Sequence, residues 1–405
     1  MHVRDGSLGL DLFDDRFVQD PYPLYERMLA AGPCHRIGDS GFHAVCSWDA
    51  VSDVIARPTD FSSNLTATMT FQDGKVGEFP MGELGSEVQA LATADDPIHA
   101  VHRKMLVPQL TARRINTLES FIADTARRLL DEGLRGGTIE WMSAMANRLP
   151  MMVVTRLIGV PDVDSEQLMR WGYASTQVVE GLVTPDELAA AGVAVMELAG
   201  YINEHFERAA AEPRDDLLSV LATACATGEV TDAAAMAMMI TLFSAGGEST
   251  ASLIGSAVRI LADRPDIQQQ VRANPDLLPV FLEEVLRYEP PFRGHYRHVL
   301  SDTTLCGEPL AKGSRLILLW GAANRDPSHF DDPDTFRLDR PGGKGHITFG
   351  KGAHFCVGAA LARLEARIVV GQLLQRTSRI EATGVGRWLP SLLVRRLEHL
   401  ELSVA

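Results

Sequence analysis

Residues 349–358 read Phe-Gly-Lys-Gly-Ala-His-Phe-Cys-Val-Gly. This decapeptide places one thiol, Cys356, in a glycine-rich loop, and a helix-forming run over 359–366 follows directly. Glycine allows backbone conformations that a Cβ forbids, so Gly350 and Gly352 also let the chain approach a flat ligand closely. Because the positive end of a helix dipole stabilises an anion, the sequence favours the thiolate form of Cys356.

A thiolate in a rigid loop can serve as the axial ligand of a haem iron, where it donates electron density that favours O–O cleavage. Phe349 would shield the sulfur from water, and His354 is a candidate donor to a haem propionate. Two alternatives remain open. Cys356 could be a small buried apolar residue. It could also bind zinc with His346 and His354, but no fourth ligand lies nearby and the chain has no C-x-x-C pair.

The decapeptide resembles the signature of the cytochrome P450 family, F-G-x-G-x-H-x-C-x-G, at every fixed position. The resemblance implies that Cys356 is the metal ligand of a haem b, and that Phe349, Gly350, His354 and Gly358 surround this cofactor. It also implies one haem-thiolate monooxygenase domain over residues 1–405. Its expected fold is mainly α with minor β, with a helix-rich body and a small β-rich lobe.

Composition excludes several classes of protein. The formal net charge of −15 argues against a dedicated nucleic-acid binder. Five unpatterned cysteines argue against a disulfide framework and for a reducing compartment. Residues 1–15 lack a basic segment and an apolar segment, so we expect no signal peptide. The uncharged stretch 233–247 is too short to span a bilayer, which predicts a soluble cytoplasmic protein without a membrane anchor.

Periodicity and turn residues predict a mostly helical chain. The length of 405 residues would by itself allow two or three domains, and 46% hydrophobic residues suffice for a large core. Hydrophobic periodicity predicts helices over 111–133, 186–211 and 275–288, among others. Short strand-like runs predict small sheets. They occur at 42–46, 315–320 and 392–402.

The segment 231–263 predicts a long helix through the core. Thr231 is a candidate N-cap, Pro265 marks the end, and apolar side chains occupy nearly all faces. Residues 245–250 read Ala-Gly-Gly-Glu-Ser-Thr. Two consecutive glycines cost about 1 kcal/mol each in a helix, which predicts a local distortion. An ionised Glu248 here would be costly unless it were paired or hydrated.

The same residues are similar to the family pattern A-G-x-(D or E)-T-(T or S). The resemblance implies that the small residues open a groove over the iron, and that Glu248, Ser249 and Thr250 deliver protons during oxygen activation. Ser249 departs from the pattern, where Thr is usual, so the hydroxyl loses the β-branch that fixes its rotamer. Thr250 could share the role. The alternative is a plain helix kink with an outward-facing Glu248.

Two further segments match the family in chain order. Glu284 and Arg287 lie at i and i+3 and correspond to the family's E-x-x-R, which an arginine from a later loop, here Arg340, locks in place. We assign these three residues a structural role. His99 and Arg103 match an H-x-x-x-R helix segment.

His99 and Arg103 lie at i and i+4 on one face, where both could bind propionates together with Arg297 and His354. The alternative is an ordinary solvated basic helix face. We expect His102 to lie on the surface.

The resemblance implies a haem-dependent monooxygenase that hydroxylates a largely apolar small molecule. Electrons would come from a ferredoxin and its reductase, because no flavin or NAD(P)H module fits within this length. By position, the loop 62–92 and a set of side chains would line the substrate pocket. The long helix contributes Thr241, Ser244 and Ala245, and the turn 292–296 contributes Phe292. The loop contributes Met69, Phe71 and Met81. Arg293 and His295 could recognise a polar group or face solvent.

A ferredoxin would dock on the cysteine side, where Lys344, Lys351, Arg363 and Arg367 offer positive charge. Two other functions stay open. One is a haem-thiolate enzyme of different chemistry, such as a peroxide-using, coupling or reductase enzyme. The other is a non-catalytic haem sensor. The glutamate and hydroxyl residues at 248–250 favour oxygen activation.

Overall fold

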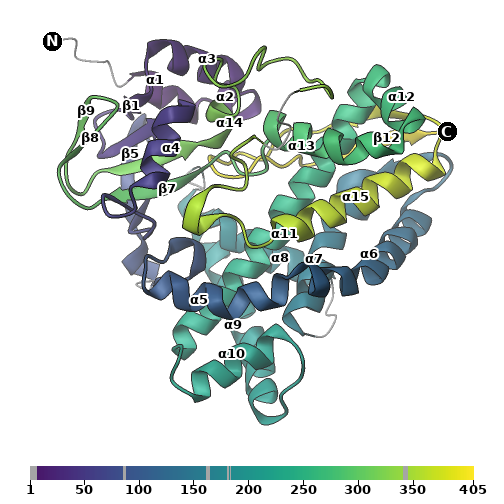
Figure 1. The fold of residues 1–405 in the computed structure, drawn as a ribbon, viewed down its shortest axis with the longest axis horizontal. Helices are drawn as coiled ribbons and strands as arrows, with labels where there is room; N and C mark the ends of the chain where they lie inside the picture. The colour runs from purple at the N-terminus through teal and green to yellow at the C-terminus, as the bar shows by residue number, and fades with distance from the viewer. Residues whose placement is uncertain (1–6, 85–87, 161–164, 180–181, 183, 341–344) are drawn as a thin grey trace.

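Helices form most of the computed structural model, which describes residues 7–405 except 85–87, 161–164, 180–181, 183 and 341–344 (Figure 1). The helices of the first half are α1 (Ser7–Leu10), α2 (Asp15–Gln19), α3 (Tyr22–Ala31), α4 (Trp48–Ala56), α5 (Ile98–Leu106), α6 (Ala112–Gly133), α7 (Arg148–Ile158) and α8 (Ser165–Gln177). Those of the second half are α9 (Pro185–Ala211), α10 (Leu217–Ala226), α11 (Asp232–Asp263), α12 (Pro265–Ala273), α13 (Leu278–Tyr288), α14 (Trp320–Ala323) and α15 (Ala359–Arg376).

The strands gather mainly in an N-terminal lobe, beside the helical body (Figure 1). Its five-stranded sheet has the order β1-β2-β10-β7-β3, in which only β2 and β10 pair in parallel. These strands are β1 (Cys34–Arg36), β2 (Phe42–Val45), β3 (Phe61–Ser62), β7 (Gly294–Val299) and β10 (Arg315–Leu319). Smaller sheets contain β4 (Ala67–Gln72) with β5 (Lys75–Pro80), β8 (Thr303–Leu305) with β9 (Glu308–Leu310), and β6 (Thr138–Glu140) with β11 (Ile380–Val385) and β12 (Leu400–Val404). The predicted class, mainly α with minor β, is confirmed.

Helix α11 runs through the middle of the body, as predicted (Figure 1). The Thr231 hydroxyl caps it by accepting a hydrogen bond from the Ala234 N–H at 3.2 Å. The expected distortion at the two glycines is wrong, because the α-helix continues unbroken from Asp232 to Asp263. The glycines serve packing instead. A Cβ on Gly246 would lie 2.7 Å from Val154 Cγ2, and one on Gly247 would lie 2.5 Å from Met151 Cε, so both allow α7 to approach closely.

Most other predicted elements are confirmed, with one clear exception. The helices at 111–133 and 186–211 and the strands at 42–46 and 315–320 appear within a residue or two of the expected bounds. The helix predicted over 275–288 begins with a short 3-10 turn before α13. The strand predicted over 392–402 is wrong for its first part. There the Ser391 hydroxyl accepts from the N–H groups of Leu393 and Val394, and the apolar side chains pack into the lobe core.

Among the helices of the described residues, none combines the length and the apolar character that a membrane span requires.

Candidate active site

The loop before α15 presents Cys356 through a tightly hydrogen-bonded turn. The Cys356 N–H donates to the Phe349 carbonyl at 2.8 Å, and the Gly350 N–H donates to the Ile347 carbonyl at 2.7 Å. Gly350 and Gly352 have φ values of +68° and +66°. Side chains strain the backbone in this left-handed region, so both positions favour glycine. The glycines predicted to shape the loop therefore do so through their backbone conformation.

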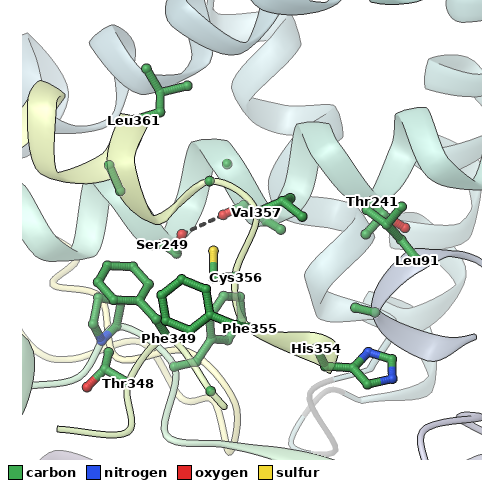
Figure 2. A pocket seen from close by; sticks show the side chains of 18 of the residues that line it. Leu91, Thr241, Ser249, Thr348, Phe349, His354, Phe355, Cys356, Val357 and Leu361 are labelled. Atoms are coloured by element: carbon green, nitrogen blue, oxygen red, sulfur yellow. Dashed lines mark hydrogen bonds between the residues drawn. The ribbon is translucent and has the colours of Figure 1, made fainter. Parts of the chain in front are cut away.

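The sulfur of Cys356 faces a large cavity. Figure 2 shows it below the helix that carries Ser249, beside the rings of Phe349 and Phe355. Cys356 is an exposed residue although protein surrounds it, because its accessible surface lies inside this cavity. Burial raises the pKa of the Cys356 thiol, and the backbone N–H groups of Gly358 and Ala359 oppose that rise. The stabilising helix terminus is present as predicted, but burial has the larger effect.

One cavity collects all the residues predicted to bind the cofactor. It contains about 1580 Å³ of atom-free space, part of which opens to solvent. The predicted cofactor residues that line it are His99, Arg103, Arg297, Phe349, Gly350, His354, Cys356 and Gly358. Ser249 and Thr250 line it from α11. Glu248 is not among the lining residues.

Imidazole and guanidinium groups gather at one side of the cavity. The rings of His99 and His354 stack with their centroids 3.9 Å apart, and the Arg103 Nη1 donates to the Phe355 carbonyl at 2.9 Å. Burial, reinforced by the charges of His99 and Arg297, lowers the pKa of His354 to about 4. Burial likewise lowers the pKa of Arg297 to about 10, against the opposing charge of Asp95.

His99 Nδ1 lies 3.4 Å from Asp96 Oδ1, whereas Arg103 and Arg297 form no ion pair among the described residues, so the carboxylates of a bound ligand would neutralise these two charges. A thiol on one wall and this cluster on another fit a haem with its two propionates. The described residues contain no group of three or more His, Cys, Asp or Glu side chains that could hold a metal ion. The zinc alternative is therefore not supported for the described part of the chain. His346 instead lies 3.2 Å from Glu283.

Glu248 has a buried partner that the sequence did not reveal. Its Oε1 accepts from the Arg396 Nε at 3.2 Å, and the Arg396 Nη1 donates to Asn147 Oδ1 at 3.3 Å. The Arg396 guanidinium also lies over the Tyr173 ring, 3.9 Å from its centroid. Burial raises the pKa of Glu248, while Arg396 and Thr176 oppose the rise. Of the two conditions that the sequence set for this glutamate, pairing or hydration, the structure shows pairing, and the partner is Arg396.

The two hydroxyl residues next to Glu248 reach the cavity. Ser249 Oγ donates to the Ala245 carbonyl of its own helix at 2.5 Å (Figure 2). Thr250 is buried, with 3% of its surface exposed. The bond to Ala245 fixes the orientation of the serine hydroxyl, which compensates for the missing β-branch.

The predicted substrate-pocket residues are only partly brought together. Thr241, Ala245 and Phe292 line the cavity. Ser244 does not, and its hydroxyl donates to the Ile240 and Thr241 carbonyls of its own helix. Leu91 and Ala92 line the cavity from the loop 62–92.

Three loop residues predicted for the pocket pack elsewhere. Met69 belongs to the core of the N-terminal lobe, Phe71 stacks on Phe13 with centroids 4.4 Å apart, and Met81 is buried but not among the lining residues. Arg293 is also absent from the lining, because it is buried and donates to the Val18 carbonyl. His295 does line the cavity.

The predicted Glu284, Arg287 and Arg340 triad is present. Arg287 binds both oxygens of Glu284 at 2.8 Å, and the Arg340 Nε lies 3.2 Å from Glu284 Oε1. The expectation for His102 is wrong. It is 3% exposed, and its Nδ1 accepts a hydrogen bond from the Leu91 N–H at 3.3 Å, so it supports the cavity wall.

The predicted docking residues differ in how free their charges are. Arg363 binds the buried Glu283 at 2.6 and 2.8 Å, and Arg367 pairs with Glu119 at 3.1 Å. Lys351 is exposed and lies over the Trp48 ring, 4.0 Å from its centroid. Lys344 lies outside the described residues.

Several lining residues escaped the sequence interpretation, including Val154, Leu157, Trp320 and Glu365. The first three look like ordinary core residues in sequence. Glu365 did carry a signal, since it is a lone acid among apolar positions of the helix that follows Cys356.

Comparisons with known proteins agree with this geometry. The profile described as Cytochrome P450 matches residues 188–384. Cytochrome P450 144 of Mycobacterium tuberculosis is 66% identical over 393 residues, covering 97% of this chain and 91% of that protein. The Biotin biosynthesis cytochrome P450 of Bacillus subtilis is 33% identical over 390 residues, covering 96% and 97%.

Solved structures are similar over nearly the whole chain. Mycobacterium smegmatis CYP164A2 in its ligand-free state has a TM-score of 0.88 and 28% identity, covering 98% of this chain and 100% of that one. P450BioI in complex with an acyl carrier protein ligated to hexadec-9Z-enoic acid has a TM-score of 0.87 and 29% identity, covering 96% and 99%.

Proposed function

This chain belongs to the cytochrome P450 family, and from that premise we propose that it hydroxylates a largely apolar small molecule with electrons from a ferredoxin and its reductase. It is a haem-thiolate monooxygenase, and the proposal concerns its substrate, its electron donor and its residues. Haem iron with a cysteine thiolate ligand supplies dioxygen activation when bound. The observation that carries the proposal is the placement of the Cys356 sulfur in the cavity. We further propose that residues 1–405 form a single domain.

We propose haem b as the form of the cofactor, with Cys356 as its iron ligand. His99, Arg103, Arg297 and His354 would bind the propionates, because all four line the cavity and the two arginines form no ion pair with a carboxylate among the described residues. Gly350 and Gly358 would let the backbone lie close to the ring.

The apolar character of the distal lining supports an apolar substrate. Leu91, Ala245 and Phe292 contribute carbon surface, and Thr241 and His295 are the nearby polar groups. The exposed surface of His295 lies in the cavity, and desolvation by the surrounding protein, with the charge of Arg297, lowers its pKa to about 4, so its imidazole is neutral at pH 7. A neutral imidazole can hydrogen-bond to a hydroxyl or a carbonyl group of the substrate. A ligand screen would start from hexadec-9Z-enoic acid and testosterone, which similar solved structures contain.

Proton delivery is assigned to the hydroxyls of Ser249 and Thr250, which line the cavity. Each hydroxyl can accept a proton from one neighbouring group and donate its own proton to a second group. Glu248 can contribute only when it leaves Arg396, because the ion pair holds its carboxylate away from the cavity lining.

The iron ligand is tested by spectroscopy of the purified protein. We expect the reduced carbonyl complex to show the red-shifted absorption of a cysteinate ligand, and we expect Cys356→Ala to lose it. The ferric protein should change from low to high spin with a suitable ligand from the screen. Absence of porphyrin, or an unchanged spectrum in Cys356→Ala, would refute the proposed ligation.

The electron donor is tested at Lys351. Among the described residues, no carboxylate forms an ion pair with Lys351, whereas Arg363 and Arg367 are both paired. We expect Lys351→Glu to slow electron transfer from a ferredoxin several-fold at low salt, with a smaller effect at high salt. Lys312→Glu, at an exposed turn between β9 and β10, is the matched control. Equal rates for both variants would remove Lys351 from the docking surface.

A further inference from the structure

Trp48 is a buried aromatic residue of α4 that contacts the cysteine loop, residues 349–358, through Lys351. The Lys351 Nζ lies 4.0 Å from the centroid of the Trp48 ring. At this distance an ammonium group is attracted to the electron-rich face of an indole, the aromatic ring that binds cations best. Because Lys351 belongs to the loop that carries Cys356, this contact joins α4 to the segment that presents the sulfur.

The neighbours of Trp48 fix its ring in one orientation. The ring stacks on His329, with centroids 3.6 Å apart and an interplanar angle of 11°, and Phe330 packs against it edge-on at 5.5 Å. The Trp48 N–H donates to Asp326 Oδ2 at 2.8 Å, and only 7% of the Trp48 surface is exposed. The indole is therefore already ordered, so its contact with Lys351 costs no further loss of rotamer freedom on that side.

His329 leaves the indole to a single cation. Burial and, after it, the charge of Lys351 lower the pKa of His329, whereas Asp326 and Asp49 oppose this change. The His329 imidazole is therefore neutral at pH 7, and it does not compete with the Lys351 ammonium for the ring.

The tip of the cysteine loop needs an anchor because it contains two glycines. Gly350 and Gly352, with φ values of +68° and +66°, flank Lys351. Glycine has no side chain that could pack, so Lys351 alone can attach this tripeptide to a neighbouring element through a side chain. Helix α4 meets the tripeptide at a second point, because a Cβ on Gly352 would lie 3.8 Å from Ile55 Cγ2. Ile55 follows Trp48 by seven positions, on the same face of α4.

We propose that Trp48 is a positioning residue for the Cys356 thiolate. Its indole binds the Lys351 ammonium and so fixes the tip of the cysteine loop. The hydrogen bond from the Cys356 N–H to the Phe349 carbonyl closes the segment that contains Lys351, so the tip and the sulfur move together. Trp48 is not among the residues that line the cavity, and it acts through Lys351 alone. The inference rests on the ligation of haem iron by Cys356 proposed above.

The contact is tested by NMR spectroscopy of the lysine side chains. The chain contains five lysines, so ¹³C-methylation of their amines, which keeps the charge, yields few signals. In the diamagnetic reduced carbonyl complex, the Lys351 signal is assigned by its loss in Lys351→Arg. We expect this signal to be shifted by the Trp48 ring current, to lose the shift in Trp48→Leu and to keep part of it in Trp48→Phe. The same signal position in wild type and in Trp48→Leu would overturn the proposal.

The positioning role is tested by the rate at which dilute urea abolishes the red-shifted absorption of the reduced carbonyl complex. We expect Lys351→Met to speed this loss about two- to fivefold, which corresponds to one exposed cation–π contact. In the Trp48→Leu background, Lys351→Met should have no further effect, because the contact is already absent.

Trp388→Leu is the matched control for the loss of a buried indole. Trp388 is 5% exposed and has the Arg395 guanidinium 3.8 Å from its ring centroid, but it lies in the C-terminal segment. Lys351→Met should keep its full two- to fivefold effect in the Trp388→Leu background. If Trp48→Leu does not fold, the same comparison is made with Trp48→Phe, in which the effect of Lys351→Met should be reduced.

The outcomes separate this inference from the proposals above. If wild type forms the cysteinate-type complex and Lys351→Met speeds its loss equally with and without Trp48, or not at all, the positioning role is refuted and the ligation stands. If wild type forms no such complex, both fall. Trp48→Leu keeps the charge of Lys351 and the assay contains no ferredoxin, so an effect on the carbonyl complex is independent of the docking proposal.

Discussion

At the scale of single residues, the pair of Glu248 and Arg396 has the clearest energetic consequence. Arg396→Met leaves a buried carboxylate unpaired, which costs about 3–5 kcal/mol of unfolding free energy at neutral pH. Without the arginine, the pKa of Glu248 in the folded protein rises further above its unfolded value. The penalty is therefore absent below the unfolded pKa of 4.5 and grows as pH rises. Denaturant unfolding at about pH 5 and pH 7 measures this difference.

The control for that pair is the double variant Glu248→Gln with Arg396→Met. It removes both charges, so it should be more stable at neutral pH than Arg396→Met alone. Equal stabilities of the two variants would mean that Glu248 is already neutral in the wild-type protein.

At the scale of elements, the contact of α11 with α7 predicts the effect of Gly246→Ala. The new Cβ improves helix propensity by about 1 kcal/mol. It would also lie 2.7 Å from Val154 Cγ2, and such overpacking typically costs about 1–3 kcal/mol. We expect net destabilisation, measured by thermal unfolding, and partial recovery when Val154→Ala is added.

Gly192→Ala in α9 is the matched control for the helix substitution. No atom lies within 4 Å of the Cβ that would be added there, so only the propensity gain remains. This variant should be stabilised by up to about 1 kcal/mol. A stabilised Gly246→Ala variant would show that α7 can move away without cost.

At the scale of the whole molecule, Glu283 joins α13 to α15 and to the segment before the cysteine loop. Burial would raise its pKa, but Arg363 and His346 overcome this and lower the pKa of Glu283 to about 2. A lowered pKa stabilises the folded protein above the unfolded pKa of 4.5, and this stabilisation is lost as pH falls toward about 2. We expect Glu283→Gln to be less stable at neutral pH and less sensitive to acid, as followed by thermal unfolding across pH.

A surface acid provides the comparison. Glu132 pairs with Arg128 and Arg148, but its side chain is 45% exposed, and exposed pairs contribute about 0–1 kcal/mol. Glu132→Gln should therefore leave the acid unfolding profile nearly unchanged. A profile shifted as much as that of Glu283→Gln would contradict a special role for the buried network.

Local signals in the sequence predicted much of this protein. The cap at Thr231, the course of α11 and the triad around Glu284 follow from residues close together in the chain or from a shared motif. The expected kink at Gly246 was wrong, because glycine in a sequence signals either flexibility or close packing. Only the presence of α7 distinguishes the two.

Capping, helical periodicity and the cysteine loop depend on neighbours along the chain, so the amino-acid order was sufficient to infer them. The partners of buried charges were not readable in that way. Arg396 lies 148 positions from Glu248, and the lack of a hydrogen-bond partner for Glu365 Oε2 among the described residues depends on all the segments packed around it. Burial and charge pairing depend on distances in three dimensions, and these arise only when segments remote in sequence pack together.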